Sequence, residues 1–182
     1  MKTLIQSLRL LLVLTVITGV IYPVAVWAVG RALFAEAAEG SLVFKDGKPV
    51  GSAHVAQKTK SPAYFHPRPS AADYATVASG AGNEAWTSKV LIDKVLARRE
   101  ALGGNDVPAD LLTTSGSGLD PEISVEAALF QVGRVEAARG LDATGRRRLE
   151  ELIALNTIGG RLTPARVNVL RLNLALETES PK

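Results

Sequence analysis

The residues that could do chemistry in this chain gather in two polar stretches. One is Tyr64-Phe65-His66-Pro67-Arg68-Pro69-Ser70-Ala71, and the other, residues 113–124, alternates glycine with serine. Prolines on both sides of Arg68 forbid a regular helix and force an extended, stiff segment. Such a segment is either a rigid connector whose Tyr64 and Phe65 pack on the core, or a recognition strip that presents Arg68 at a fixed position. The residue types by themselves favour the connector.

The Ser/Gly-rich stretch exposes backbone amides and hydroxyls that could cradle an anion. Its residues suit tight turns equally well, with Ser124 as the N-cap of a following helix. A hydrolase site is not supported, because the order Ser115-Gly116-Ser117-Gly118 lacks the G-x-S-x-G frame. Neither His54 nor His66 belongs to a motif that would place an imidazole base beside these serines.

Other catalytic motifs are missing from the sequence. Residues 80–85 match a dinucleotide fingerprint formally, but no buried strand precedes them. The chain has no phosphate-binding P-loop, and two isolated histidines without any cysteine offer no metal-ligand cluster. We therefore expect no catalytic residue, no bound cofactor and no metal site.

An apolar stretch near the N-terminus decides where these polar segments work. Residues 10–29 carry no charge, and as a helix they span about 30 Å, the hydrocarbon thickness of a bilayer. A cleaved signal peptide is the alternative, because Lys2 and Arg9 form a basic start and small residues follow. Signal peptides, however, have a shorter apolar region of about 7–15 residues. We predict an uncleaved transmembrane helix over residues 10–30 that stays helical to about Glu39.

Flanking charges predict the orientation of this helix. Basic residues in short flanks tend to stay cytoplasmic, which favours a cytoplasmic tail over residues 1–9 and an extracytoplasmic domain over residues 31–182, in the periplasm or its equivalent. Without Lys2 and Arg9, the 21 basic residues fall to 19 against 18 acidic ones. The exported part is thus near neutral, and its charge gives no argument for nucleic acid binding.

The exported part is expected to form one small α+β domain. A hairpin is predicted from residues 42–44 and 50–57, which flank the turn sequence Lys45-Asp46-Gly47-Lys48. Apolar periodicity predicts helices over residues 86–102, 108–112, 125–139 and 142–156. From Leu170 to Leu176 a leucine stands at every second position, which predicts a strand, although Thr163-Pro164 could instead cap a helix there.

Several motifs in one order resemble the KdpC family, the small C subunits of the bacterial potassium-importing P-type ATPase. They are the 64–71 stretch, Val107-Pro108-Ala109-Asp110-Leu111, residues 115–124, Gln131-Val132-x-Arg134-Val135-x-x-Ala138-Arg139-Gly140, and Arg166-Val167-Asn168-Val169-Leu170-x-Leu172-Asn173-x-Ala175-Leu176. The single N-terminal anchor also fits, so the resemblance covers essentially the whole chain. The sequence departs from the family pattern over residues 79–86, at Gly133 and at Glu122.

The resemblance implies a non-catalytic accessory subunit of a four-component pump. Its implied partners are a channel-like potassium-binding subunit, a P-type ATP-hydrolysing subunit and a second small membrane subunit, so the complex rather than this chain handles ATP and potassium. The family is described as assembling the pump and as a catalytic chaperone that raises ATP affinity. An exported binding or adhesion module unrelated to transport is the alternative.

Two sets of residues are candidates for contacts with other subunits. The exported domain is expected to dock on the outer face of the channel-like subunit through the candidate contact set, which is Arg68, Pro69, Ser70, Ser115, Gly116, Ser117, Gly118, Asp120 and Pro121. In the anchor, Thr15, Thr18 and Gly19 lie within about one turn and would let another helix approach closely. Pro23 is expected to bend the anchor near the outer leaflet.

Overall fold

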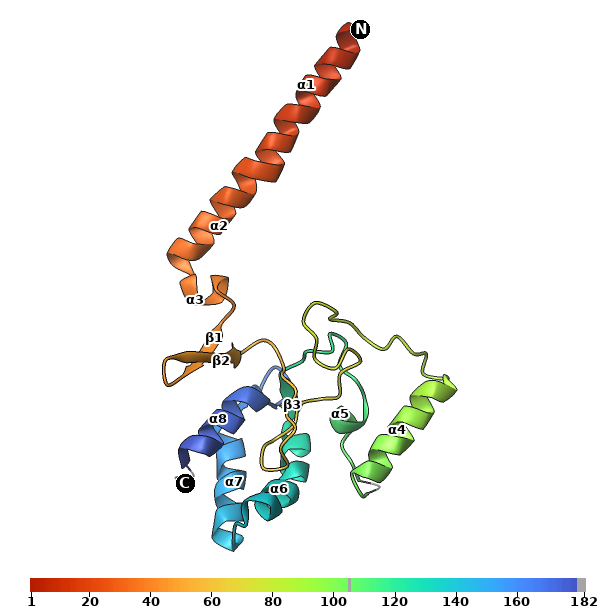
Figure 1. The fold of residues 1–182 in the computed structure, drawn as a ribbon, viewed down its shortest axis with the longest axis vertical. Helices are drawn as coiled ribbons and strands as arrows, with labels where there is room; N and C mark the ends of the chain where they lie inside the picture. The colour runs from red at the N-terminus through yellow and green to blue at the C-terminus, as the bar shows by residue number, and fades with distance from the viewer. Residues whose placement is uncertain (105, 180–182) are drawn as a thin grey trace. The chain divides into compact units, whose positions relative to one another are not determined.

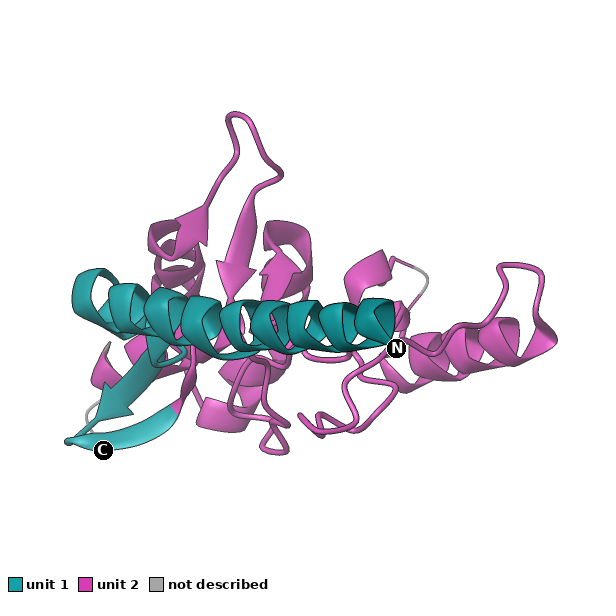
Figure 2. Cartoon of the chain, turned by 90° about the horizontal axis from the view of Figure 1, so that it is seen from above, with its two compact units in different colours: residues 1–50 teal, residues 51–182 magenta. Residues whose placement is uncertain are grey.

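The fold has two compact units, residues 1–50 and 51–182, in a computed structural model that describes residues 1–104 and 106–179 (Figures 1 and 2). The first unit contains a long helix and a hairpin. The second contains the hydrophobic core, a small sheet and the remaining helices. The predicted architecture, an N-terminal apolar helix followed by a small mixed helix and sheet domain, is confirmed.

The N-terminal helix is long and apolar enough to cross a bilayer. It consists of α1 (Lys2–Val16), a π-helical turn (Ile17–Ile21) and α2 (Tyr22–Leu33), with a mean hydropathy of 2.3 over its most apolar window. The expected continuation to about Glu39 is wrong at one point. Phe34, with φ −136° and ψ 46°, leaves the helical region, and a separate short helix, α3 (Ala35–Ala38), follows.

A wide turn lies just before Pro23, where the sequence predicts a bend. The backbone N–H of Tyr22 donates to the carbonyl of Ile17, the spacing of a π-helix. Proline has no N–H to donate, and its ring crowds the carbonyl four residues earlier, here that of Gly19. Widening the preceding turn is one of the recognised ways in which a helix accommodates such crowding.

The hairpin after the long helix is confirmed, with one shifted strand. It pairs β1 (Leu42–Lys45) with β2 (Lys48–Ser52), so the second strand begins and ends earlier than the predicted 50–57. Asp46 and Gly47 both have positive φ, 51° and 73°. An Asp-Gly pair with two positive φ angles matches the twist of a two-residue hairpin, which is why the strands meet here.

The core of the second unit lies between three helices and a three-stranded antiparallel sheet. The helices are α6 (Val125–Arg139), α7 (Ala143–Leu155) and α8 (Val169–Glu179), which gather together in Figure 1. The strands are β3 (Glu122–Ser124), β5 (Arg166–Asn168) and β4 (Thr157–Ile158), in the spatial order β3-β5-β4. Val167, in the central strand, faces Ile123 on one side and Thr157 on the other.

Three predicted helices are confirmed, and two of them, α6 and α7, have side-chain N-caps. The three helices are α5 (Ala109–Leu112), α6 and α7. Ser124 Oγ accepts a hydrogen bond from the N–H of Ala127 (3.1 Å) at the start of α6, and Gly140 ends that helix with φ 63° and ψ 34°. Asp142 caps α7 in the same way through Gly145 (2.8 Å). Each cap satisfies a backbone group that the helix end leaves unpaired.

Helix α4 (Lys89–Ala101) differs from the other helices of the second unit because it adds almost nothing to the core. It begins three residues later than predicted, with Ser88 in an extended conformation at the N-cap. None of its residues, all of which the structure describes, is buried. Ile92 and Leu96 remain 48% and 51% exposed. The periodicity therefore predicted a helix correctly, but not its burial.

The strand predicted from Leu170 to Leu176 is wrong, because this segment is helix α8. Val169, Leu172 and Leu176 are buried, and their spacing of three and four residues fits one face of a helix and not one face of a strand. The helix does not start at Thr163-Pro164 either. Asn168 Oδ1 accepts from the N–H of Arg171 (3.1 Å) and caps the first turn, directly after strand β5.

Candidate functional site

Two side-chain amides hold the strip, which is residues 64–70 with its prolines on both sides of Arg68, in the fold. Gln131 in α6 accepts from the N–H of His66 (2.8 Å) and donates to the carbonyl of the same residue (3.1 Å). Asn173 in α8 does the same for Phe65, at 2.8 and 2.9 Å. Each amide thus pairs with a backbone residue as a neighbouring strand would. These bonds pair the backbone N–H and carbonyl groups of an extended segment that joins none of the described sheets.

Two arginines of α6 extend this hold toward the start of the strip. Arg134 Nη1 donates to the carbonyls of Pro62 (2.6 Å) and Tyr64 (3.0 Å), and its Nη2 donates to Gln131 Oε1 (2.7 Å). Arg139 Nε donates to the carbonyl of Ala63 (2.7 Å), and its guanidinium lies 5.1 Å from the centre of the Tyr64 ring. Burial lowers the pKa of Arg134.

Phe65 and Tyr64 confirm the connector interpretation of the strip. Phe65 is fully buried in the core, and Tyr64 packs against it while its hydroxyl donates to Glu177 (2.5 Å). Apolar contacts of Phe65 and Tyr64 therefore anchor the strip to the core, and hydrogen bonds from α6 and α8 fix its backbone. A segment held in this way presents the following residues, starting with Arg68, at a fixed position.

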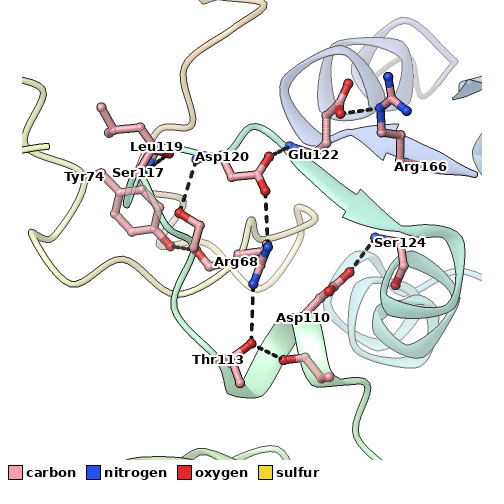
Figure 3. Close-up of polar contacts among 12 residues, drawn as sticks. Arg68, Tyr74, Asp110, Thr113, Ser117, Leu119, Asp120, Glu122, Ser124 and Arg166 are labelled. Atoms are coloured by element: carbon pink, nitrogen blue, oxygen red, sulfur yellow. Dashed lines mark hydrogen bonds and ion pairs between the residues drawn. The ribbon is translucent and has the colours of Figure 1, made fainter. Parts of the chain in front are cut away.

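Arg68 joins the strip to the Ser/Gly-rich stretch (Figure 3). Its Nη1 donates to Asp120 Oδ2 (3.3 Å) and its Nη2 to Thr113 Oγ1 (3.4 Å). Its carbonyl accepts from the hydroxyl of Tyr74 (2.8 Å). The Arg68 side chain is 24% exposed, and its buried Nε has no hydrogen-bond partner among the described residues. The arginine that the sequence singled out is thus paired within its own chain.

The loop of residues 115–121 is closed by its own backbone and by its contacts with the strip. Ser115 N–H donates to the carbonyl of Pro69 (3.1 Å), and Gly118 N–H donates to that of Ser115 (3.2 Å). Gly118 has φ 71°, and a Cβ there would lie 2.9 Å from the carbonyl oxygen of Gly80. Only glycine fits such a position without strain. Ser117 and Asp120 form local turns by accepting from backbone N–H groups two residues onward.

The candidate contact set therefore comes together in space, although its two halves are far apart in the sequence. Ser115 and Gly118 are buried and serve the loop, whereas Gly116 and Ser117 are exposed. The remaining members are half-buried: Arg68, Pro69, Ser70, Asp120 and Pro121. No group of three or more metal-ligating side chains occurs in the part of the chain that the structure describes.

Sequence reasoning missed the residues that position this cluster. Gln131 and Arg134 were noted only as part of a family-like motif, and Asn173 was assigned to a strand. One signal was available: Gln131 and Arg134 stand three residues apart on a strongly predicted helix, so they share a face.

In the other unit, Thr18 Oγ1 donates to the carbonyl of Leu14 (2.8 Å), and a Cβ at Gly19 would meet no atom within 4 Å.

Comparison with known proteins gives one consistent result. A family model described as "K+-transporting ATPase, c chain" matches residues 4–178. A protein of Rhodospirillum rubrum named "Potassium-transporting ATPase KdpC subunit" is 47% identical, over 100% of this chain and 98% of its own length. Proteins of the same name from Rhodopseudomonas palustris (strain BisB5) and Dechloromonas aromatica are 44% and 42% identical, over at least 99% of both chains.

The strip makes the stability of the second unit depend on pH through His66. Burial lowers the pKa of His66 below its ordinary value, and nearby Arg134 lowers it further. The carbonyl of Ser61, 2.9 Å from Nε2, acts in the opposite direction and raises the pKa. Because the unfolded state binds the proton more readily, stability should be complete above the unfolded pKa of about 6.5 and fall as pH decreases below it.

Denaturant unfolding of the full-length chain in detergent, from about pH 8 to about pH 5, tests this. The wild-type chain should lose more unfolding free energy across that range than His66→Gln, which keeps the backbone bonds to Gln131 but cannot titrate. Equal losses in the two proteins would contradict the prediction.

Proposed function

Because the chain belongs to the KdpC family of K+-transporting ATPase C chains, we propose that it assembles and stabilises an ATP-driven potassium import complex as a non-catalytic subunit. The single observation that carries this proposal is the cluster in which Arg68 binds Asp120 and Thr113. It brings two distant polar segments together on a strip that α6 and α8 hold rigidly. A preorganised surface of this kind loses little conformational entropy when a partner binds.

The proposed partners are a channel-like potassium-binding subunit, a P-type ATP-hydrolysing subunit and a second small membrane subunit. Docking takes place on the outer face of the channel-like subunit, through the exposed loop residues Gly116 and Ser117 and the half-buried rim around Arg68. The names of the relatives support a role within a potassium-transporting ATPase. An adhesion module unrelated to transport would not share a family model over residues 4–178.

Replacement of Arg68 tests the docking surface. Arg68→Ala removes both side-chain hydrogen bonds and leaves Asp120 Oδ2 without its guanidinium partner, so the chain itself should lose about 1 kcal/mol of unfolding free energy. The complex should lose more: we expect the subunit to dissociate in mild detergent and potassium uptake at low external potassium to fall several-fold.

A control variant and a stability measurement separate the loss of docking from the loss of folding. Arg68→Lys keeps the charge and is the matched control, which should retain most of the assembly. Unfolding of the isolated chain shows whether Arg68→Ala remains folded at the assay temperature. A folded Arg68→Ala chain that stays in a detergent-stable complex with normal uptake would contradict the docking proposal.

We further propose that the chain crosses the inner membrane once, with residues 1–9 in the cytoplasm and the second unit outside. Lys2 and Arg9 before the apolar stretch support this orientation. In this topology the second unit cannot touch cytosolic ATP. Any chaperone effect on ATP affinity would therefore be a coupling between distant sites that passes through the complex.

The absence of cysteine from the sequence allows a direct test of this topology. Leu162 is 98% exposed in the loop between β4 and β5, so a single Leu162→Cys substitution should react with a membrane-impermeant maleimide in intact spheroplasts. Thr3→Cys, the control at the other end, keeps both basic residues and should react only after the membrane is opened. The reverse pattern would overturn the orientation.

Within the membrane, we propose that Thr15, Thr18 and Gly19 form a surface where another helix packs. Thr18 Oγ1 is bonded within its own helix, and Gly19 has open space around it, so a neighbouring backbone could approach closely.

Gly19→Leu should therefore weaken assembly, measured as the fraction of the subunit that co-purifies with the pump. Val13→Phe adds bulk to the opposite side of α1 and serves as the control, which should co-purify normally. If Gly19→Leu assembles as well as Val13→Phe, the segment acts only as an anchor.

A further inference from the structure

A cavity of about 530 Å³ opens within the second unit, between α4, α6 and the strip. The strip contributes His66 and its two prolines, α4 and the residue after it contribute Arg98, Ala101 and Leu102, and α6 contributes Phe130, Gln131 and Arg134. Its volume falls within the usual range for ligand sites. The cavity lies on the α4 side of the strip, and none of its lining residues except Pro69 belongs to the candidate contact set.

The cavity is cationic. Arg98 and Arg134 line it from two different helices, and the described residues of its wall include no carboxylate. The closest acidic residue in sequence to the lining residue Tyr74 is Asp73, which is already paired with Lys58 at 2.6 Å. His66 adds no charge near neutral pH, because burial lowers its pKa. The rest of the wall is largely apolar and includes Leu102, Leu111 and Phe130.

The two arginines are oriented by neutral partners. Arg98 Nη1 donates to the carbonyl of Leu112 (2.7 Å), and Arg134 donates to two carbonyls and a side-chain amide. Such bonds fix the direction of a guanidinium but do not neutralise it. The Glu84 carboxylate, whose pKa is lowered by its hydrogen bond from Lys94 and also by nearby Arg98, is already paired with Lys94. A partly buried cation that lacks a counter-charge of its own is unfavourable, and a guanidinium has five donors to share with an additional acceptor. A carboxylate in the cavity would supply the missing charge.

Part of the cavity wall is both apolar and exposed. Leu102, directly after α4, and Phe130, in α6, are 38% and 36% exposed, and they form an apolar surface beyond what a small anion would cover. Stable protein contacts bury about 800 Å² on each partner. The combination of a charged cavity with exposed apolar residues in its wall therefore fits a protein segment better than a free ion.

We infer that this cavity receives an acidic side chain, flanked by apolar residues, from an extracytoplasmic segment of a partner subunit of the pump. The inference rests on the proposed function, because it needs a partner subunit on the same side of the membrane. It adds a second contact, on the α4 side of the strip, to the docking surface around Arg68. The acidic side chain pairs with Arg98 and Arg134 while its neighbours cover Phe130 and Leu102.

Photocrosslinking in the assembled pump tests this inference. Ala101 lines the cavity and is exposed, so p-benzoylphenylalanine at this position reports what enters it. Ala97, exposed on the same helix but not part of the lining, is the matched control. We expect an adduct from position 101 with another pump subunit, at a segment containing Asp or Glu, and a much weaker one from position 97.

Charge reversal at Arg98 sharpens the test. Combined with the crosslinker at position 101, Arg98→Glu should reduce the adduct at least about tenfold, since a carboxylate would then face a carboxylate, whereas Arg98→Lys should retain it. The unfolding temperature of each variant chain shows that it remains folded.

Other outcomes overturn the inference in distinguishable ways. If the wild-type chain co-purifies with the pump but position 101 gives no adduct, the proposed function stands and the inference is wrong. If the wild-type chain does not co-purify, the proposed function fails as well. If citrate raises the unfolding temperature of the purified full-length chain and Arg98→Glu abolishes that shift, while position 101 gives no adduct, the cavity binds a free organic anion instead.

Discussion

The second unit depends on one kind of interaction: side chains of two helices that bind the backbone of an extended strip. Gln131 and Asn173 each satisfy both the N–H and the carbonyl of one strip residue, and Arg134 gathers the carbonyls that precede them. Prolines prevent the strip from forming a helix, and Phe65 anchors it in the core. Without these bonds, several backbone polar groups would be buried unpaired, at a cost of about 1–3 kcal/mol each.

This arrangement connects the fold to the proposed docking surface. Because the strip cannot move independently of α6 and α8, Arg68 emerges at a fixed place and can organise the loop of residues 115–121 through Asp120. The same strip forms one wall of the cationic cavity beneath α4. One rigid segment thus supports both surfaces to which we assign contacts with other subunits.

The sequence predicted the long helices well because their signals are local. The periodicity of α6 and α7, with Ser124, Gly140 and Asp142 as caps, requires no knowledge of the rest of the chain. Strands β3, β4 and β5 are two or three residues long, too short for any periodicity, and they form only because distant segments pair. In α8 a leucine at every second position is compatible with both periods, and the packing of Val169, Leu172 and Leu176 decides for the helix.

For the candidate site, residue types indicated the right neighbourhood but not its bonds. The prolines around Arg68 and the glycines near Ser117 marked unusual backbone, and the structure places the two stretches in contact. That Arg68 pairs with Asp120, or that Gln131 substitutes for a strand, depends on a tertiary arrangement that no local pattern encodes. For a related reason, periodicity predicted helix α4 but could not show that the fold leaves its apolar side chains exposed.

The central claim, that this chain is an assembly subunit of a potassium pump, is tested most directly by its partners in native membranes. The full-length chain should be purified from its own cells after mild solubilisation, and the proteins that elute with it identified and quantified. The account predicts a stable complex with large multi-spanning membrane subunits, one of them a P-type ATPase, in fixed ratio. A chain that purifies alone as a stable monomer under conditions that keep other membrane complexes intact would contradict it.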